Sequence, residues 1–315
     1  MKVFIDFLIN SLAFGAVFIY GSTGEIITEK SGHLNLGIPG IMCMGGAGGC
    51  MLLNAFGKSG MPGFLLVFLS IVCAFISAAA VGLIYSFLTV TLRANQNVTG
   101  LALTTFGVGL MKYIMAGFDA TVYLVGPKKY FRFPFQNMTN SLQFLGVMFF
   151  LAIAVAILAS YVLYKTRVGL HLRAVGESPA TADAAGINVT KYKYFATCIG
   201  SGVAGLGGLY YIMDYMGSQE AYKSIESLGW LAIALVIFAL WRPHMTIIGS
   251  TVFGFLFSCS SYIANFIDIT MAWKPILKML PYLVTIIVLV VTSIKNTKEN
   301  QPPASLGLNY YREDR

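Results

Sequence analysis

The side chains of this sequence that could carry proton or ion chemistry are few and scattered. Four ionisable residues, Asp6, Glu25, Lys112 and Asp214, fall within or beside long apolar runs. An ionisable group at membrane depth is a candidate for a proton or sodium relay, because burying it in hydrocarbon is costly. Positions close to a membrane interface explain the same residues more simply, so the relay remains an alternative.

Signatures of enzymatic or metal chemistry do not occur in the sequence. It has no HExxH, no GxSxG, no phosphate-binding loop and no paired metal-ligand spacing. Its five cysteines lie in apolar segments without a CxxC pair, which predicts free buried thiols rather than disulfides or zinc. The histidines His33, His171 and His244 are scattered at expected membrane edges. We therefore expect a protein that is not an enzyme and holds no metal or cofactor.

Long apolar helices are the elements that must position these residues. Hydrophobic residues make up 57% of the 315 residues and charged residues 11%, whereas soluble domains carry about 25% charged residues. This composition predicts an all-α polytopic membrane protein with about eight to ten transmembrane helices, at least one of them short or broken. Basic residues cluster at span ends, so the net charge of +8 indicates retained cytosolic loops rather than a nucleic-acid partner.

Nine apolar segments are candidate spans within one transmembrane domain, residues 1–315. They cover approximately 4–23, 36–56, 64–92, 97–117, 141–164, 194–215, 229–241, 245–267 and 276–294. The segment 229–241 is too short to cross alone, so either part of 216–228 extends it or it forms a half-helix. No segment between the spans is long enough to form a soluble domain.

One long polar segment, residues 165–193, separates the spans. Ser178 and Pro179 predict a helix start, because serine caps helices and proline fits the first turn, and Gly186 predicts its stop. Basic residues at both edges of the segment predict a cytosolic position. With nine crossings the C-terminal tail, residues 295–315, is then cytosolic too, and the N-terminus lies outside.

Small residues dominate two further segments. Six glycines and Pro39 within 37–49 argue against a regular span, which leaves close helix packing or a broken, pathway-lining helix. The GxxxG-like run 200–208 predicts helix packing. Polar or small residues near such segments are candidates for a substrate pathway, although packing or capping also explains each of them. They are Asn35, Gly37, Gly40, Asn97, Thr104 and Thr105.

Four stretches, in order, resemble the permease subunits of ATP-binding cassette (ABC) importers. They read GEIITEKSGHLNLGIPG (24–40), GLHLRAVGESPATADAAGIN (169–188), GWLAIALVIFALWRP (229–243) and PYLVT (281–285). The resemblance is to the branch that includes branched-chain amino acid, simple sugar and nucleoside permeases. The tail PASLGLNYYRE (303–313) is similar to the ending of nucleoside-type members. Two departures are Pro39, where an acidic residue is commoner, and 224–229, which lacks a Gly-Arg-Gly.

The resemblance implies an importer driven by a partner chain in the bacterial cell membrane. A cytosolic ABC ATPase, often a tandem one, docks on the central loop, which holds the coupling helix. A second permease subunit, often a different chain, completes the pathway. A lipoprotein of the basic-membrane-protein type delivers substrate outside, and alternating access follows from ATP-driven movement of the coupling helix. The residues of this segment are Arg173, Gly176, Glu177, Ser178, Pro179, Ala180, Asp183 and Gly186.

Nucleosides are the cargo that this resemblance favours. Riboflavin and simple sugars are alternatives within the same branch. A gradient-driven secondary transporter is less favoured, because such a protein needs ionisable groups near the membrane midplane and this chain is poor in them.

Overall fold

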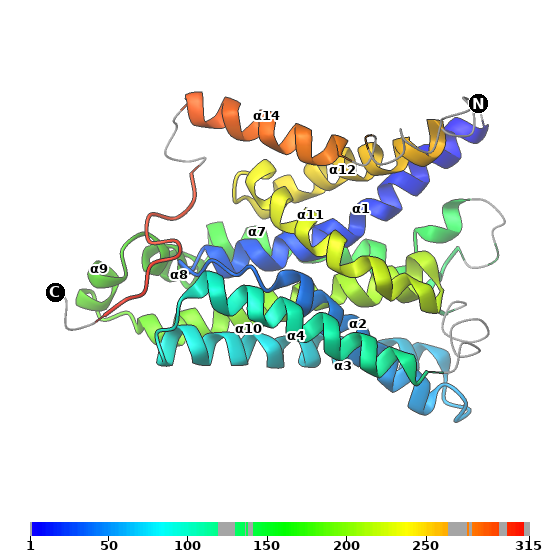
Figure 1. Ribbon diagram of the computed structural model, residues 1–315, viewed down its shortest axis with the longest axis horizontal. Coiled ribbons are helices and arrows are strands. Elements are labelled where there is room, and N and C mark those ends of the chain that lie inside the picture. Colours follow the sequence, from blue (N-terminus) through cyan, green and yellow to red (C-terminus); the bar gives the residue numbers. More distant parts are fainter. Residues whose placement is uncertain are drawn as a thin grey trace.

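The computed structural model describes residues 2–118, 130–135, 137, 141–263, 276, 279–295 and 301–311, and all regular secondary structure among them is helical. The long helices run roughly along the longest axis of the molecule (Figure 1). Among these residues, seven helical segments are long and apolar enough to cross a membrane. The all-α polytopic fold is therefore confirmed.

The helices follow one another in an order close to the predicted spans. They are α1 (Lys2–Glu29), α2 (Ile38–Phe56), α3 (Gly63–Ser86) with its π-helical extension η1 (Phe87–Thr91), α4 (Gln96–Ala116), η2 (Ser141–Phe144), α7 (Val147–Lys165), α8 (Arg167–Glu177), α9 (Pro179–Ala184), α10 (Val189–Leu209) with its π-helical extension η3 (Tyr210–Met216), η4 (Gln219–Ser224), α11 (Ile225–Phe238), α12 (Pro243–Ile263) and α14 (Leu280–Lys295).

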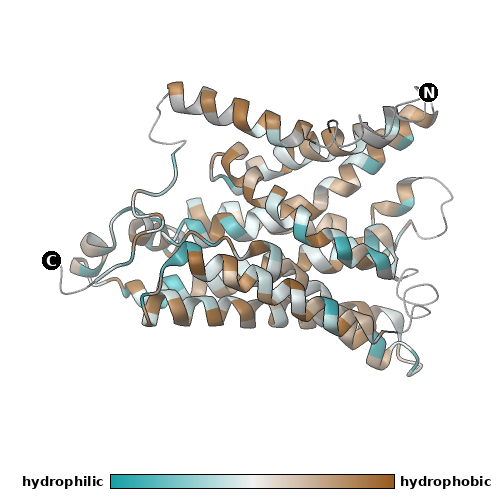
Figure 2. Ribbon diagram, in the orientation of Figure 1, coloured by the Kyte–Doolittle hydropathy of each residue, from teal (hydrophilic) through white to brown (hydrophobic). Residues whose placement is uncertain are grey.

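The ends of the bundle differ in what they carry. The C-terminal tail and the short helices α8 and α9 lie at one end, and the N-terminus lies at the other (Figure 1). Hydrophobic residues follow the lengths of the helices, and hydrophilic residues gather towards the ends (Figure 2). The loop and the tail that we expect on one side of the membrane thus share one end of the bundle.

The glycine-rich segment is a regular helix, so the expectation of an irregular span there is wrong. α2 is continuous, and Pro39 lies in its first turn, where a missing N–H costs little. A Cβ at Gly208 of α10 would lie 2.9 Å from the backbone carbon of Met42, and one at Gly40 would lie 2.7 Å from Thr104 Cα. The small residues let α2 pack closely against α10 and α4, as the packing interpretation predicts.

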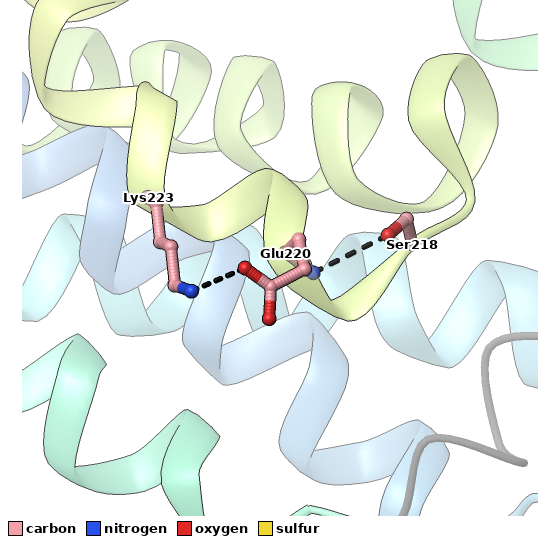
Figure 3. Close-up of polar contacts among 3 residues, drawn as sticks. All are labelled: Ser218, Glu220 and Lys223. Atoms are coloured by element: carbon pink, nitrogen blue, oxygen red, sulfur yellow. Dashed lines mark hydrogen bonds and ion pairs between the residues drawn. The ribbon is translucent and has the colours of Figure 1, made fainter.

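The short predicted span is extended at its start, as one of our two alternatives proposed. Residues Glu220–Phe238, from η4 and α11, together form a segment long enough to cross a membrane. Ser218 Oγ accepts a hydrogen bond from the Glu220 amide at 3.3 Å, and the Glu220 carboxylate pairs with Lys223 (Figure 3). This capped 3-10 turn leads directly into α11.

Candidate functional site

The polar loop forms two helices, of which the sequence predicted one. α9 begins and ends as expected: Ser178 Oγ accepts from the Thr181 amide at 3.4 Å, and Gly186 has a left-handed φ of +82°. α8 was not predicted. Its cap is Thr166, whose hydroxyl accepts from the Gly169 amide at 3.2 Å. The loop is therefore a structured helical pair rather than a single helix.

α9 is fixed on its inner side and free on its outer side. Ala182, 3% exposed, packs in a small apolar cluster with Val175 of α8 and Val189 of α10. The residues on the outer side are exposed. They are Ala180, Thr181, Ala184, Ala185 and Gly186. A short helix that packs against its neighbours on one side and is exposed on the other is suited to move with a partner protein that binds it.

The C-terminal tail crosses this helical pair. The amide of Ser305 donates to Gly176 O at 3.1 Å, and that of Gly307 donates to Gly32 O at 3.2 Å. The Tyr310 hydroxyl donates to Asp183 Oδ2 at 2.8 Å. The tail thus ties α8 and α9 to the connection between α1 and α2, a contact that the sequence did not reveal.

Gly176 is the point where α8 meets the α1–α2 connection. A Cβ there would lie 3.0 Å from the carbonyl carbon of Lys30 and closer still to its oxygen. Burial lowers the pKa of the Lys30 ammonium, and the Glu177 carboxylate acts in the opposite direction. Arg173, on the preceding turn, lies 5.1 Å from the centre of the Tyr164 ring. A displacement of α8 and α9 would therefore reach α1 and α2 through direct backbone contact.

Four of the six predicted pathway residues come together, in a packing contact. Asn35 is buried; its backbone N–H donates to Glu25 Oε1 at 3.0 Å, and its side-chain Oδ1 accepts from the Gly37 backbone N–H at 2.9 Å. Thr104 donates from its hydroxyl to Leu36 O at 2.8 Å, beside the close α2–α4 contact at Gly40. These bonds start α2 and hold it to α4.

The other two predicted pathway residues lie on the exposed side of α4. Asn97 and Thr105 are both exposed, and the Thr105 hydroxyl bonds only within its own helix, to Leu101 O at 3.2 Å. Neither lies beside the four residues described above. Whether any of the six contacts a substrate stays a prediction.

The ionisable residues lie near helix ends. Asp6, Glu25, Lys112 and Asp214 are each within about one turn of the end of α1, α4 or η3. Glu25 and Asp214 are nevertheless buried. Glu29, one turn after Glu25, is a third buried carboxylate, and it accepts a hydrogen bond from the indole Nε1–H of Trp241. The sequence analysis did not identify Glu29 as a buried residue. Among the residues with described positions, no three His, Cys, Asp or Glu side chains could hold a metal ion.

A cavity of about 710 Å³ lies at the other end of the bundle, beside the start of α1 and the end of η3. Aromatic rings dominate its wall, from α1, η2, η3 and α12. They are Phe7, Phe14, Phe144, Tyr211, Tyr215, Phe257 and Tyr262. The sequence suggested that some aromatic residues could face a cavity without showing which ones. The i, i+4 spacing of the two tyrosines on η3 is the one local signal that could have identified it.

Polar groups in this cavity are held in fixed positions. Arg132 donates from Nη1 to Gln143 Oε1 at 2.9 Å and from Nη2 to Tyr215 O at 3.0 Å. Its guanidinium lies 4.6 Å from the centre of the Phe144 ring. Asn10 donates to Ser141 Oγ at 3.3 Å. Aromatic rings with amide and guanidinium groups beside them suit a planar ligand that carries polar edges.

Comparison with known proteins identifies the family. Residues 7–291 match the model described as branched-chain amino acid transport system / permease component. The chain is 31% identical to the nucleoside ABC transporter permease protein NupC of Lactococcus lactis over 96% of both chains. It is 30% identical to the guanosine ABC transporter permease protein NupQ of Bacillus subtilis over 89% of both chains. It is 32% identical to TsgC13 of Haloferax volcanii, provisionally assigned as a glucose ABC transporter permease, over 76% of this chain and 72% of the relative.

Proposed function

We propose that this chain, which belongs to the branched-chain amino acid transport system / permease component family of ABC transporters, carries nucleosides into the cell. Membership of the family makes it a multi-pass membrane protein and a non-catalytic transport subunit that works with an ATPase and a binding protein. The nucleoside cargo, the tandem ATPase, the heterodimeric second permease and the lipoprotein are parts of the proposal.

The aromatic cavity is the observation that carries the nucleoside assignment. Base–aromatic stacking contributes about 1–3 kcal/mol per base, which is enough to select a nucleoside from a sugar that has no aromatic base. A volume of about 710 Å³ lies within the range of about 300–1,000 Å³ typical of small-molecule sites. The relatives named for nucleosides and guanosine support the same cargo, and the one named for glucose makes sugar the alternative to test.

The coupling segment supplies the proposed energy input. An ATPase that seats on the exposed side of α9 would move α8 with it, because Ala182 and Val175 share one apolar cluster. Gly176 passes the movement to the Lys30 backbone and so to α1, whose opposite end lines the aromatic cavity. Packed helices of this kind switch between discrete arrangements, which is what alternating access requires.

Uptake by reconstituted vesicles tests the cargo. The complete importer, assembled with its ATPase, second permease and binding protein, is supplied with ATP and labelled guanosine, riboflavin or glucose. We expect guanosine uptake, and we expect Tyr215→Ala to reduce its kcat/KM about 5- to 150-fold through loss of stacking. The backbone carbonyl of Tyr215, which binds Arg132, is retained in this variant.

A matched control is Tyr113→Ala, because Tyr113 is 81% exposed on α4 and lies outside the cavity wall. We expect normal uptake from it. Transport of glucose or riboflavin instead of guanosine would refute the nucleoside assignment. Equal guanosine uptake by the two alanine variants would refute the role of the cavity.

A further inference from the structure

A second cavity, of about 650 Å³, lies at the α9 end of the bundle and has no role in the transport scheme above. Its wall combines five parts of the chain: the α1–α2 connection, the end of α3 with η1, the stop of α9, the first turns of α10 and the C-terminal tail. The residues used in the argument below are His33, Arg93, Asp183, Asn188, Lys191 and Lys193.

Lys193 is the unusual residue of this cavity. Its side chain is 3% exposed and lines the cavity. Its ammonium makes no hydrogen bond or ion pair with any residue whose position is described. The side chain is mostly buried but its ammonium lines the cavity without a partner among the described residues, so it is available to an anion that enters there.

The surroundings of Lys193 favour negative charge. Arg93 and Lys191 also line the cavity, and Asp183, the one acidic residue among the described residues of the wall, already accepts from the Tyr310 hydroxyl. The Thr197 hydroxyl donates to Lys193 O at 2.9 Å, so it accepts from His33 Nδ1 at 3.3 Å, and His33 adds no negative charge to the wall.

A long helix also begins at the cavity. Asn188 caps α10 by accepting from the Lys191 amide at 2.9 Å, and the first helical residues, Val189 and Thr190, lie on the wall. Helix N-termini carry partial positive charge and exposed N–H groups, which bind phosphate groups well. The helix terminus and the buried ammonium are independent features that point to the same ligand charge.

We propose that this cavity binds a phosphate group, carried by an anionic lipid or free in the cytosol. The group would lie between Lys193, Arg93 and the start of α10. A bound phosphate would join the stop of α9 to α10 and to the tail, and so would stiffen the segment proposed to receive the ATPase. The site does not depend on the identity of the cargo.

Thermal unfolding of the purified full-length chain in nanodiscs tests the site. The probes are phosphatidylglycerol, with phosphatidylcholine as the zwitterionic reference, and inorganic phosphate, with chloride at equal ionic strength. We expect at least one probe to raise Tm in the wild type. Lys193→Met should weaken that binding about 10-fold or more, because it removes a charge-assisted hydrogen bond. Without any probe this variant should be at least as stable as the wild type, since the cost of burying most of a charged side chain is removed.

Lys165→Met is the matched control, because Lys165 is exposed at the end of α7 and does not line the cavity. Arg93→Gln is a second, milder variant, which should weaken binding in the same direction. A shift with phosphatidylglycerol alone identifies a lipid headgroup, and a shift with inorganic phosphate in phosphatidylcholine identifies the free anion. The proposal is overturned if no probe raises Tm, or if wild type, Lys193→Met and Lys165→Met respond alike. Binding seen only in a chain that ends at Tyr311 would also overturn it, because the carboxylates of residues 312–315 would then be the natural partner.

Discussion

Replacing Gly186 with tryptophan tests whether the exposed side of α9 binds the ATPase, with little effect on the stability of the permease itself. Gly186 has a φ of +82°, and a Cβ placed there meets no atom within 4 Å. The Cβ itself therefore meets no clash, and the cost expected for the isolated chain is the left-handed backbone strain, about 1–2 kcal/mol. For a chain of 315 residues, that corresponds to a fall in Tm of about 2–3 °C.

Gly60 provides the matched control. It too has a left-handed φ, +73°, and a Cβ added to it would meet no atom within 4 Å, but it lies in the turn between α2 and α3. Gly60→Trp should therefore lower Tm by the same amount. Only Gly186→Trp adds bulk to the exposed side of α9, where the proposed ATPase seats.

Co-purification of the ATPase with the detergent-solubilised permease is the assay. We expect Gly186→Trp to reduce the recovered ATPase at least about 10-fold, because a buried clash of this kind costs more than about 1.4 kcal/mol of binding free energy. Gly60→Trp should recover the wild-type amount. Equal recovery with both variants, at equal Tm, would show that the partner does not contact α9 at Gly186.

Two further predictions concern packing and transmission. Thr104→Val removes a buried hydrogen bond to Leu36 O and should lower the free energy of unfolding by about 1–2 kcal/mol. Thr105→Val should change the free energy of unfolding by less than about 0.5 kcal/mol. Denaturation in detergent measures both values, and reduced uptake by the stable Thr105→Val variant would instead support a pathway role for Thr105. Gly176→Ala should force α8 away from the Lys30 backbone, so we expect normal ATPase recovery but ATP hydrolysis that no longer drives uptake. Normal uptake by this variant would contradict the proposed transmission from α8 to α1 through the Lys30 backbone.

The sequence predicted those features that depend on neighbouring residues. The apolar runs gave the helices, and Ser178, Pro179 and Gly186 gave the bounds of α9, because capping and turn preferences act within a few residues. α2 differs from the expectation of an irregular span, although the six glycines from 37 to 49 have low helix propensity. In a packed helix pair, the close backbone approach that glycine permits outweighs its low helix propensity.

The features that the sequence did not predict join distant segments. Tyr215 and Phe14 line one cavity although they are far apart in the chain, and Ser305 bonds to Gly176. Arg132 follows the fourth predicted span and gave no sign that it would bond to residues of η3. Such contacts follow from the order in which helices pack, which local patterns do not encode.

The tail changes how the proposed ATPase contact must be understood. Glu177 and Asp183, the acidic residues of the coupling segment, both accept hydrogen bonds from the tail, from the Ala304 amide at 3.3 Å and from the Tyr310 hydroxyl. If either carboxylate paired with a basic residue of the ATPase, it would compete with these bonds. What remains uncovered on α9 is small and almost uncharged, namely Ala180 and its exposed neighbours. Recognition there must depend on shape and close approach, since exposed ion pairs contribute little and are screened by salt. The acidic residues of the loop are thus better explained as anchors for the tail than as contacts for the ATPase.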